Sequence, residues 1–236
     1  MKRFWQTASV DAGDGGWTVL LDARPLRTPA KAPLQLPTAA LADAIAAEWQ
    51  AAPAEVEIAN LPLTALAYAA IDVVRPGRPA IIGSLAAYAE TDLTCYRADT
   101  PAALVAAQQA AWEPALQAVE KRHSIAFQRI SGIRYVEQPA ATIAAVRARL
   151  NALSDFELAA LQPLVTIAGS IVLALAHVDG TLTAEQAFHA AHVDEDWQKA
   201  QWGSDSEAQA RQAARQRDYL AASHFLQLLR NCPAPP

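Results

Sequence analysis

The spacing of hydrophobic positions along the 236-residue chain changes after about residue 40. Before that point, segments 2–10 and 16–22 carry β-branched and aromatic residues, and the glycine-rich stretch 11–15 between them is a strong turn signal. Two short pieces bounded by prolines follow, at 24–29 and 33–37. Because proline cannot donate to a sheet ladder, such pieces belong at a sheet edge. The pattern predicts a small antiparallel sheet at the N-terminus.

After residue 40, hydrophobic residues recur at the spacing of helices. Leu41, Ile45 and Trp49 form one apolar stripe, and Thr38 stands where it can cap that helix. The apolar run 164–178 is expected as one central, buried helix. Three sites have the spacing of a capping box, in which Ser or Thr precedes Glu or Gln by three residues: Ser154/Glu157, Thr183/Gln186 and Ser204/Glu207.

These signals predict an α+β fold, with a small N-terminal antiparallel β-containing domain followed by an all-α C-terminal bundle. We expect the N-terminal domain, which includes one or two helices, at residues 1–75 and the helical domain at 76–236. The pattern restricts the boundary only to a position between 60 and 100.

Composition excludes several classes of function. Hydrophobic residues make up 53% of the chain, enough for a sizeable core, and the net charge is −5 with scattered basic residues, which argues against a nucleic-acid partner. The longest apolar run is shorter than the roughly 20 residues that span a bilayer, so no integral membrane segment is expected. No glycine-rich loop is followed by lysine, so we expect no bound nucleotide. Two cysteines are too few for a disulfide framework or a four-cysteine zinc site.

One pattern suggests a metal site. On a helix beginning near Thr183, the side chains of Glu185, His189, His192 and Asp196 would share one face. Four such positions extend over about 16 Å, too far for a single ion, and the other predicted helices offer few further ligands. A solvated polar face is therefore favoured, and we expect no metal, cofactor or catalytic residue. A metal-dependent hydrolase or oxygenase using His189 and His192 is the alternative.

Segment 192–203 combines three consecutive acids with two tryptophans. On the same helical wheel, Trp197 faces the bundle and is expected to be structural, while Glu195 lies almost opposite, near Phe188 and Lys199. Such an exposed carboxylate lies outside any pocket, which argues against acid–base catalysis. The wheel alone favours an ordinary solvated acid, and contact with a basic or amide group of a partner protein is the alternative.

Short motifs occur in order from about residue 3 to about residue 230. They lie at 3–6 (Arg-Phe-Trp-Gln), 21–29, 46–49, 61–64, 91–97, 109–114, 194–198 and 202–203. As an ordered series they resemble the assembly chaperones of F1-ATPase that act on the alpha subunit, found in mitochondria and in alphaproteobacteria.

The resemblance implies a chaperone without enzymatic activity. Such a protein binds the unassembled F1 alpha subunit, keeps it from aggregating and releases it as the beta subunit takes its place. The resemblance also implies an important acid in the helical domain, and Glu195 matches that pattern. On this basis the expected partner-binding residues are Phe188, Asp194, Glu195, Asp196 and Lys199.

Two further expectations concern structure and location. Trp49 matches a family position needed for structural integrity, and both Trp49 and Trp5 are expected in the core. Mitochondrial relatives, which act in the matrix, begin with a presequence, whereas this chain starts almost at the motif 3–6. We therefore expect a protein of the bacterial cytoplasm, and a mature chain from which a presequence has been removed is the alternative.

Overall fold

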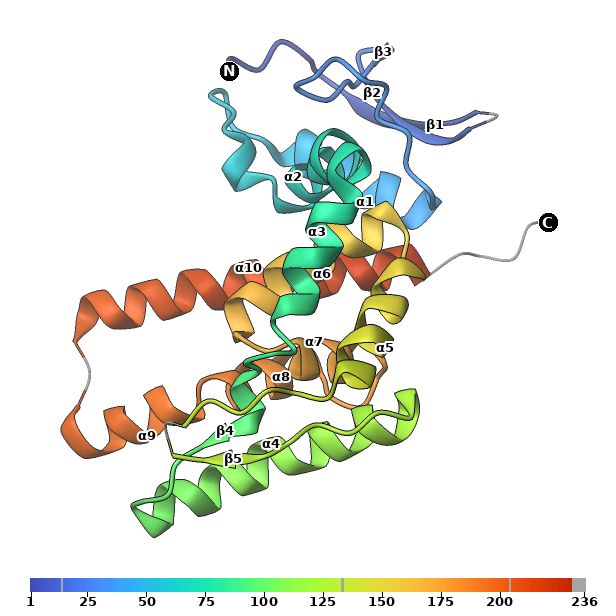
Figure 1. Ribbon diagram of the computed structural model, residues 1–236. Coiled ribbons are helices and arrows are strands. Elements are labelled where there is room, and N and C mark those ends of the chain that lie inside the picture. Colours follow the sequence, from blue (N-terminus) through green and yellow to red (C-terminus); the bar gives the residue numbers. More distant parts are fainter. Residues whose placement is uncertain (14, 133, 204, 231–236) are drawn as a thin grey trace. The chain divides into compact units, whose positions relative to one another are not determined.

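The computed structural model describes residues 1–13, 15–132, 134–203 and 205–230 (Figure 1). Strands come first and helices dominate the rest. The strands are β1 (Ala8–Gly13), β2 (Gly16–Leu21), β3 (Arg24–Pro25), β4 (Tyr96–Arg97) and β5 (Ile130–Ser131). The α-helices are α1 (Ala39–Ala51), α2 (Pro62–Ala69), α3 (Arg75–Ala87), α4 (Ala102–His123), α5 (Ala140–Asn151), α6 (Asp155–Ala168), α7 (Ile171–Val178), α8 (Ala184–Ala191), α9 (Val193–Trp202) and α10 (Ser206–Arg230).

The α+β fold predicted from the sequence is confirmed, but the division of the chain differs from two consecutive domains. The first compact unit contains Met1–Arg78, and the second begins at Pro79, close to the expected boundary. However, Leu153–Ala160 and the part of α10 from Ala221 also belong to the first unit. The hydrophobic spacing of a helix shows that one face is buried, but not in which unit. The sequence therefore did not predict that these two later segments join the first unit.

In the first unit, the sheet has the order β1-β2-β3 and both pairs are antiparallel. The hairpin between β1 and β2 requires glycine at position 16, where φ is +121° and a Cβ atom would lie 2.5 Å from the carbonyl oxygen of Leu36. Helix α1 packs against β1 and β2 and is capped by Thr38, whose side chain accepts from the backbone N–H of Leu41.

Two tryptophans form the centre of this first core. Trp49 on α1 is 1% exposed, and its indole N–H donates to the hydroxyl of Thr64 at 3.0 Å. The indole N–H of Trp5 donates to the carbonyl oxygen of Trp49 at 3.1 Å, and the two ring centroids are 5.0 Å apart. Both indoles are therefore buried with their polar groups satisfied, so that neither incurs a desolvation penalty.

In the second unit, the apolar run 164–178 is two helices and not the single helix expected. Gly169 adopts φ +63° and ends α6, and Ser170 caps α7 by accepting from the N–H of Leu173. The wholly buried carboxylate of Asp92 accepts from the Ser170 hydroxyl at 2.8 Å and from the N–H of Val172 at 3.0 Å. The N-terminus of this apolar helix therefore lies beside a buried acid, whose negative charge interacts favourably with the positive end of the helix dipole.

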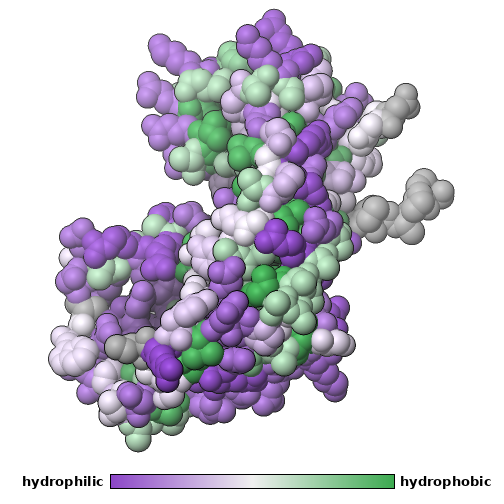
Figure 2. Space-filling view, viewed as in Figure 1, coloured by the Kyte–Doolittle hydropathy of each residue, from purple (hydrophilic) through white to green (hydrophobic). Residues whose placement is uncertain are grey.

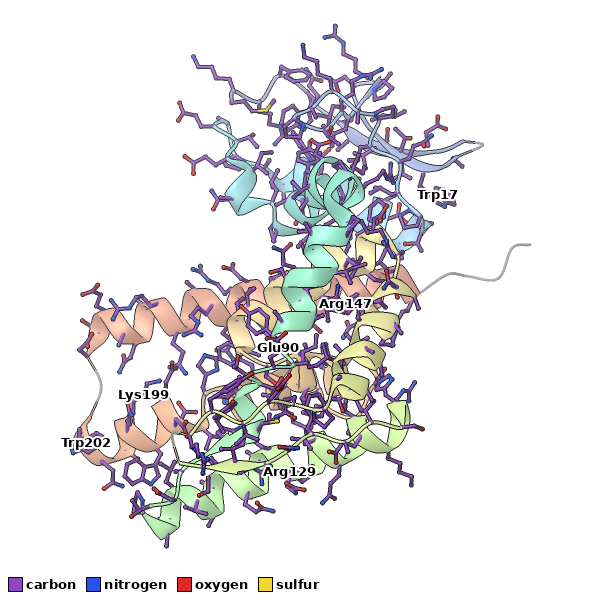
Figure 3. All side chains as sticks on the ribbon, in the orientation of Figure 1. Trp17, Glu90, Arg129, Arg147, Lys199 and Trp202 are labelled. Atoms are coloured by element: carbon purple, nitrogen blue, oxygen red, sulfur yellow. The ribbon has the colours of Figure 1, made fainter. Side chains whose placement is uncertain are left out.

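A network of charged side chains connects α4 to the parallel pair β4–β5. Glu113 on α4 accepts from Arg97 at 2.7 Å and from Arg129 at 2.8 Å, and Arg129, labelled in Figure 3, also contacts Glu120 at 2.6 Å. The hydrogen bonds from Arg129 and Arg97 lower the pKa of Glu113 to about 2, against the effect of its partial burial.

Two predicted capping boxes are present at helix starts. The side chains of Thr183 and Gln186 bond each other's backbone N–H groups at the start of α8, and Ser154 and Glu157 do the same at α6. The third predicted box depends on Ser204, which lies outside the described residues. Among the helices that the structure describes, none is both long enough and apolar enough to cross a membrane.

Candidate functional site

The acidic segment is divided between two helices. Helix α8 ends at Ala191, α9 begins at Val193, and His192 between them has φ −113° and ψ 16°. The buried imidazole of His192 bonds the carbonyl oxygen of Phe188 through Nδ1 at 2.7 Å, and its ring stacks on that of Phe188 with centroids 4.1 Å apart. The predicted continuous helix is therefore wrong, and residues on the two sides of His192 do not share one helical wheel.

The break separates the residues of the alternative metal site. His192 is buried, whereas His189 is exposed on α8, so the two imidazoles do not lie on one common face. Glu185 lies in the first turn of α8 and Asp196 in the first turn of α9. Within the described parts of the chain, no three or more His, Cys, Asp or Glu side chains come together in a way that could hold a metal ion.

Two aromatic residues have environments other than those expected. Phe188 is 1% exposed, so the prediction that it contributes to a partner-binding face is wrong. The side of α8 that carries Phe188 packs inward, against Tyr219 of α10. Trp197, expected to anchor the bundle, is only half-buried, and its ring packs edge-on against that of Trp202 with centroids 5.9 Å apart.

The three acids occupy the first turn of α9, a helix without a side-chain cap. Their negative charges therefore stabilise α9 by interacting with the positive end of its helix dipole. Asp194 accepts from the Gln108 side chain at 2.6 Å, which fixes the start of α9 to α4. Glu195 lies between His192 Nε2 at 3.7 Å and Arg215 of α10 at 3.6 Å. Asp196 faces Lys199 at 3.4 Å.

A groove of about 420 Å³ lies between α9 and the first part of α10. Figure 3 shows Lys199 on the side of α9 that faces α10, where it donates to Gln212. Trp202 at the end of α9 also lines the groove and is 75% exposed, more than any other large hydrophobic residue in the described chain. The α10 side is lined by Arg211 and Arg215.

The groove combines an exposed aromatic ring with loosely paired charges. The side chains of Glu195 and Arg215 are 48% and 45% exposed, so their interaction across 3.6 Å is screened by water and contributes little to stability. A partner's ammonium or guanidinium group could therefore replace Arg215 beside Glu195 at little cost. Such features suit reversible recognition of a protein surface.

The sequence prediction included Glu195, Asp194, Asp196 and Lys199 but missed the α10 side of this groove. Arg211 and Arg215 are four residues apart and so share a helix face, which is a visible signal. The sequence does not indicate that this face turns towards α9. Trp202 belongs to segment 192–203 and to the motif 202–203, but neither pattern predicts that it lines a groove beside α10.

The family model described as ATP12 chaperone protein matches residues 2–120, about half of the chain. The chain belongs to this family. Its resemblance to assembly chaperones, inferred from the ordered motifs, is thereby confirmed at the level of the family.

Solved structures of the family extend the match to nearly the whole chain. The crystal structure of Atp12 from Paracoccus denitrificans is 41% identical with a TM-score of 0.93, and the match covers 97% of this chain and 98% of that one. A candidate chaperone from Agrobacterium tumefaciens is 40% identical with a TM-score of 0.92, covering 97% and 86% respectively. Among curated relatives, the mitochondrial protein atp12 of Schizosaccharomyces pombe is 26% identical over 95% of this chain and 81% of its own length.

Proposed function

We propose that this protein is an assembly chaperone for the F1 sector of ATP synthase. It binds the unassembled alpha subunit and prevents its aggregation until the beta subunit takes its place. The observation that carries the proposal is the structural match to Paracoccus denitrificans Atp12 over 97% of the chain, together with membership of a chaperone family. We propose that it acts by binding alone, without enzymatic activity or a cofactor.

The physical basis is the exposed surface of an incomplete assembly. A subunit that lacks its neighbour exposes an apolar interface, which leads to aggregation. A chaperone covers that interface reversibly, and release needs no nucleotide if the incoming subunit binds more tightly. The groove between α9 and α10 supports this role for two reasons. Trp202 offers apolar area to a partner, and the charged residues around it can exchange their present ion pairs for pairs with that partner.

Within this groove we propose Glu195 as the main contact with the alpha subunit. Asp196 and Lys199, which lie on the same helix, contribute further charged contacts. Asp194 is bonded to Gln108, so we assign it a positioning role at the start of α9. Phe188 is buried and has no part in this proposed contact.

Co-expression with an F1 alpha subunit tests the function. We expect the alpha subunit to remain soluble only when this protein is present, and a complex of the two to be recovered by affinity purification. If the alpha subunit is equally insoluble with and without this protein, and no complex is recovered, the proposed function is wrong.

The variant Glu195→Lys tests the site. Reversing this exposed charge places a cation beside Arg215 and repels a basic partner, so we expect at least a tenfold loss of affinity for the alpha subunit. The melting temperature should hardly change, because exposed pairs contribute about 0–1 kcal/mol. Asp218→Lys is the matched control, since Asp218 is exposed on α10 but does not line the groove. Equal affinities for the two variants would remove Glu195 from the site.

We further propose that the protein acts in the cytoplasm of a bacterium. The two closely similar solved structures come from bacteria, whereas the curated relative named as mitochondrial is less similar. Fractionation of bacterial cells tests this: recovery with the periplasmic fraction would contradict it.

A further inference from the structure

A second groove, of about 330 Å³, lies within the first unit. Its walls come from the first residues of the chain, from the segment that begins with β3, and from α2. Two of the most exposed large hydrophobic residues in the described chain line it, Met1 at 59% and Phe4 at 58% exposure. Pro25, Pro29 and Tyr68 add further apolar surface. Figure 2 shows hydrophobic groups, in green, exposed among hydrophilic ones on the region of the surface that contains these N-terminal segments.

The walls of this groove are held in place before any partner arrives. Phe4 packs edge-to-face on Trp5 with centroids 5.2 Å apart, and Trp5 is itself buried. The backbone N–H of Leu26 donates to the carbonyl oxygen of Val19 at 2.8 Å, which attaches the proline-bounded segment to β2. The N–H of Ala30 donates to an Asp72 carboxylate oxygen at 3.0 Å. A preformed apolar surface binds with a smaller loss of conformational entropy.

The charge at this groove is opposite to that of the chain as a whole. The net charge of the chain is −5, yet the described residues that line the groove include Arg24 and Arg27 and no acid. Both arginines are exposed, and neither forms an ion pair with any described residue. The Arg27 guanidinium donates to the carbonyl oxygen of Lys31 at 3.0 Å.

The nearest acid in the sequence does not neutralise this pair of arginines. The Asp22 carboxylate accepts from the backbone N–H groups of Thr7 and Gln6 at 2.9 and 3.0 Å. Those bonds, and to a smaller extent the charge of Arg24, lower the pKa of Asp22. Because the Asp22 oxygens are directed at the start of β1, the guanidinium groups of Arg24 and Arg27 are available to a carboxylate from outside the chain.

We propose that this groove is a second docking site, which binds an apolar polypeptide segment with a carboxylate beside its apolar side chains. The occupant is a segment of the captured F1 subunit, so the inference rests on the proposed function. Phe4 and the two prolines contact the apolar side chains, and Arg24 and Arg27 contact the carboxylate. A chaperone with two separate contacts gains affinity through the linkage between them.

Two substitutions in the 236-residue protein test the two halves of the groove separately. Phe4→Ser removes exposed apolar area, and Arg27→Glu reverses the rim charge. We expect each to weaken binding of the purified F1 alpha subunit about tenfold, as for residues near the centre of an interface. Matched controls are Val73→Ser, another exposed apolar residue of the first unit, and Lys121→Glu on α4, since neither lines either groove. The controls should change the affinity less than twofold.

Separate measurements test whether the variants fold and whether an ion pair contributes to binding. Phe4→Tyr retains the aromatic ring that packs on Trp5, so this variant should bind the alpha subunit as the wild type does. Unchanged melting temperatures would show that all variants fold. For the charge, raising the salt concentration should weaken binding of the wild type more than of Arg27→Glu, because the wild type has the additional ion pair to screen.

The outcomes separate this inference from the proposed function. If the wild type does not capture the alpha subunit, the proposed function fails, and the inference fails with it. If the wild type captures it and both Phe4→Ser and Arg27→Glu capture it equally well, only the inference is overturned. A wild-type dimer in sedimentation that Phe4→Ser converts to a monomer would show that a second copy of the chain occupies the groove, and this result would also overturn the inference.

Discussion

Replacing Asp92 with alanine removes the carboxylate that accepts hydrogen bonds from the first residues of α7. The carboxylate is wholly buried and accepts four hydrogen bonds from three residues. Oδ1 accepts from the N–H and hydroxyl of Thr94 at 3.0 and 2.7 Å and from the Ser170 hydroxyl at 2.8 Å, while Oδ2 accepts from the N–H of Val172 at 3.0 Å. Burial raises the pKa of Asp92, and these hydrogen bonds act in the opposite direction.

The expected loss in the free energy of unfolding for Asp92→Ala follows from the hydrogen-bond donors that are left without an acceptor. The two backbone N–H groups, of Thr94 and Val172, lose their acceptor in a dry environment, at about 1–3 kcal/mol each. The hydroxyls of Thr94 and Ser170 lose one partner each, but removal of the buried carboxylate also removes its own desolvation penalty. We therefore expect a net loss of about 2–4 kcal/mol, which is a large part of the 5–15 kcal/mol typical of a folded protein.

Urea unfolding followed by tryptophan fluorescence measures this loss. Asp92→Asn should cost less than Asp92→Ala, because the amide oxygen can still accept the three bonds made by Oδ1 while the amide N–H₂ faces the N–H of Val172. Asp218→Ala on the exposed face of α10 is the control and should change stability by less than about 0.5 kcal/mol. A loss below about 1 kcal/mol for Asp92→Ala would refute the proposed role of Asp92 at the start of α7.

Two further predictions concern the core and the charge network. Trp49→Arg buries a charge without a counterion and loses the bond to Thr64, so we expect insoluble protein on expression, whereas Trp49→Phe should remain soluble. A soluble Trp49→Arg protein with normal melting would contradict the core role. The lowered pKa of Glu113 implies stability that is fully present above about pH 4.5 and is lost as the pH falls towards about 2, on the order of 3 kcal/mol in total. Glu113→Gln should flatten the dependence of the urea midpoint on pH in that window, and an unchanged slope would show that Arg97 and Arg129 do not lower this pKa.

Features encoded by neighbouring residues could be predicted from the sequence. The hairpin follows from a glycine-rich turn between alternating strands, and the capping boxes at Thr183 and Ser154 follow from spacing alone. The apolar stripe through Trp49 indicated which side of α1 is buried. In each case the interaction that decides the structure lies within a few residues, so the pattern contains it.

Features that depend on distant contacts could not be predicted. The hydrophobic spacing continues through His192, but distant residues of α4 bind the chain on both sides of the break. The indole N–H of Trp112 donates to the carbonyl oxygen of Ala190 at 2.7 Å, and the Gln108 side chain donates to Asp194 at 2.6 Å. The apolar run 164–178 divides because Asp92, almost 80 residues earlier, binds the start of α7. The groove at Glu195 needs Arg215 of α10 beside it, and no local signal places these two helices together.

The separation of α9 from α8 has a consequence for the rate at which its amide protons exchange with solvent. None of the ten residues of α9 is fully buried, and its first turn lacks a side-chain cap. Little free energy therefore opposes local opening of α9, whereas α7, with seven of its eight residues buried, opens only with its core. Deuterium should enter the backbone of α9 much sooner than that of α7, and a bound partner should slow this entry at α9 but not at α7. The labelling time of this one helix would report occupancy directly, without any measurement of aggregation.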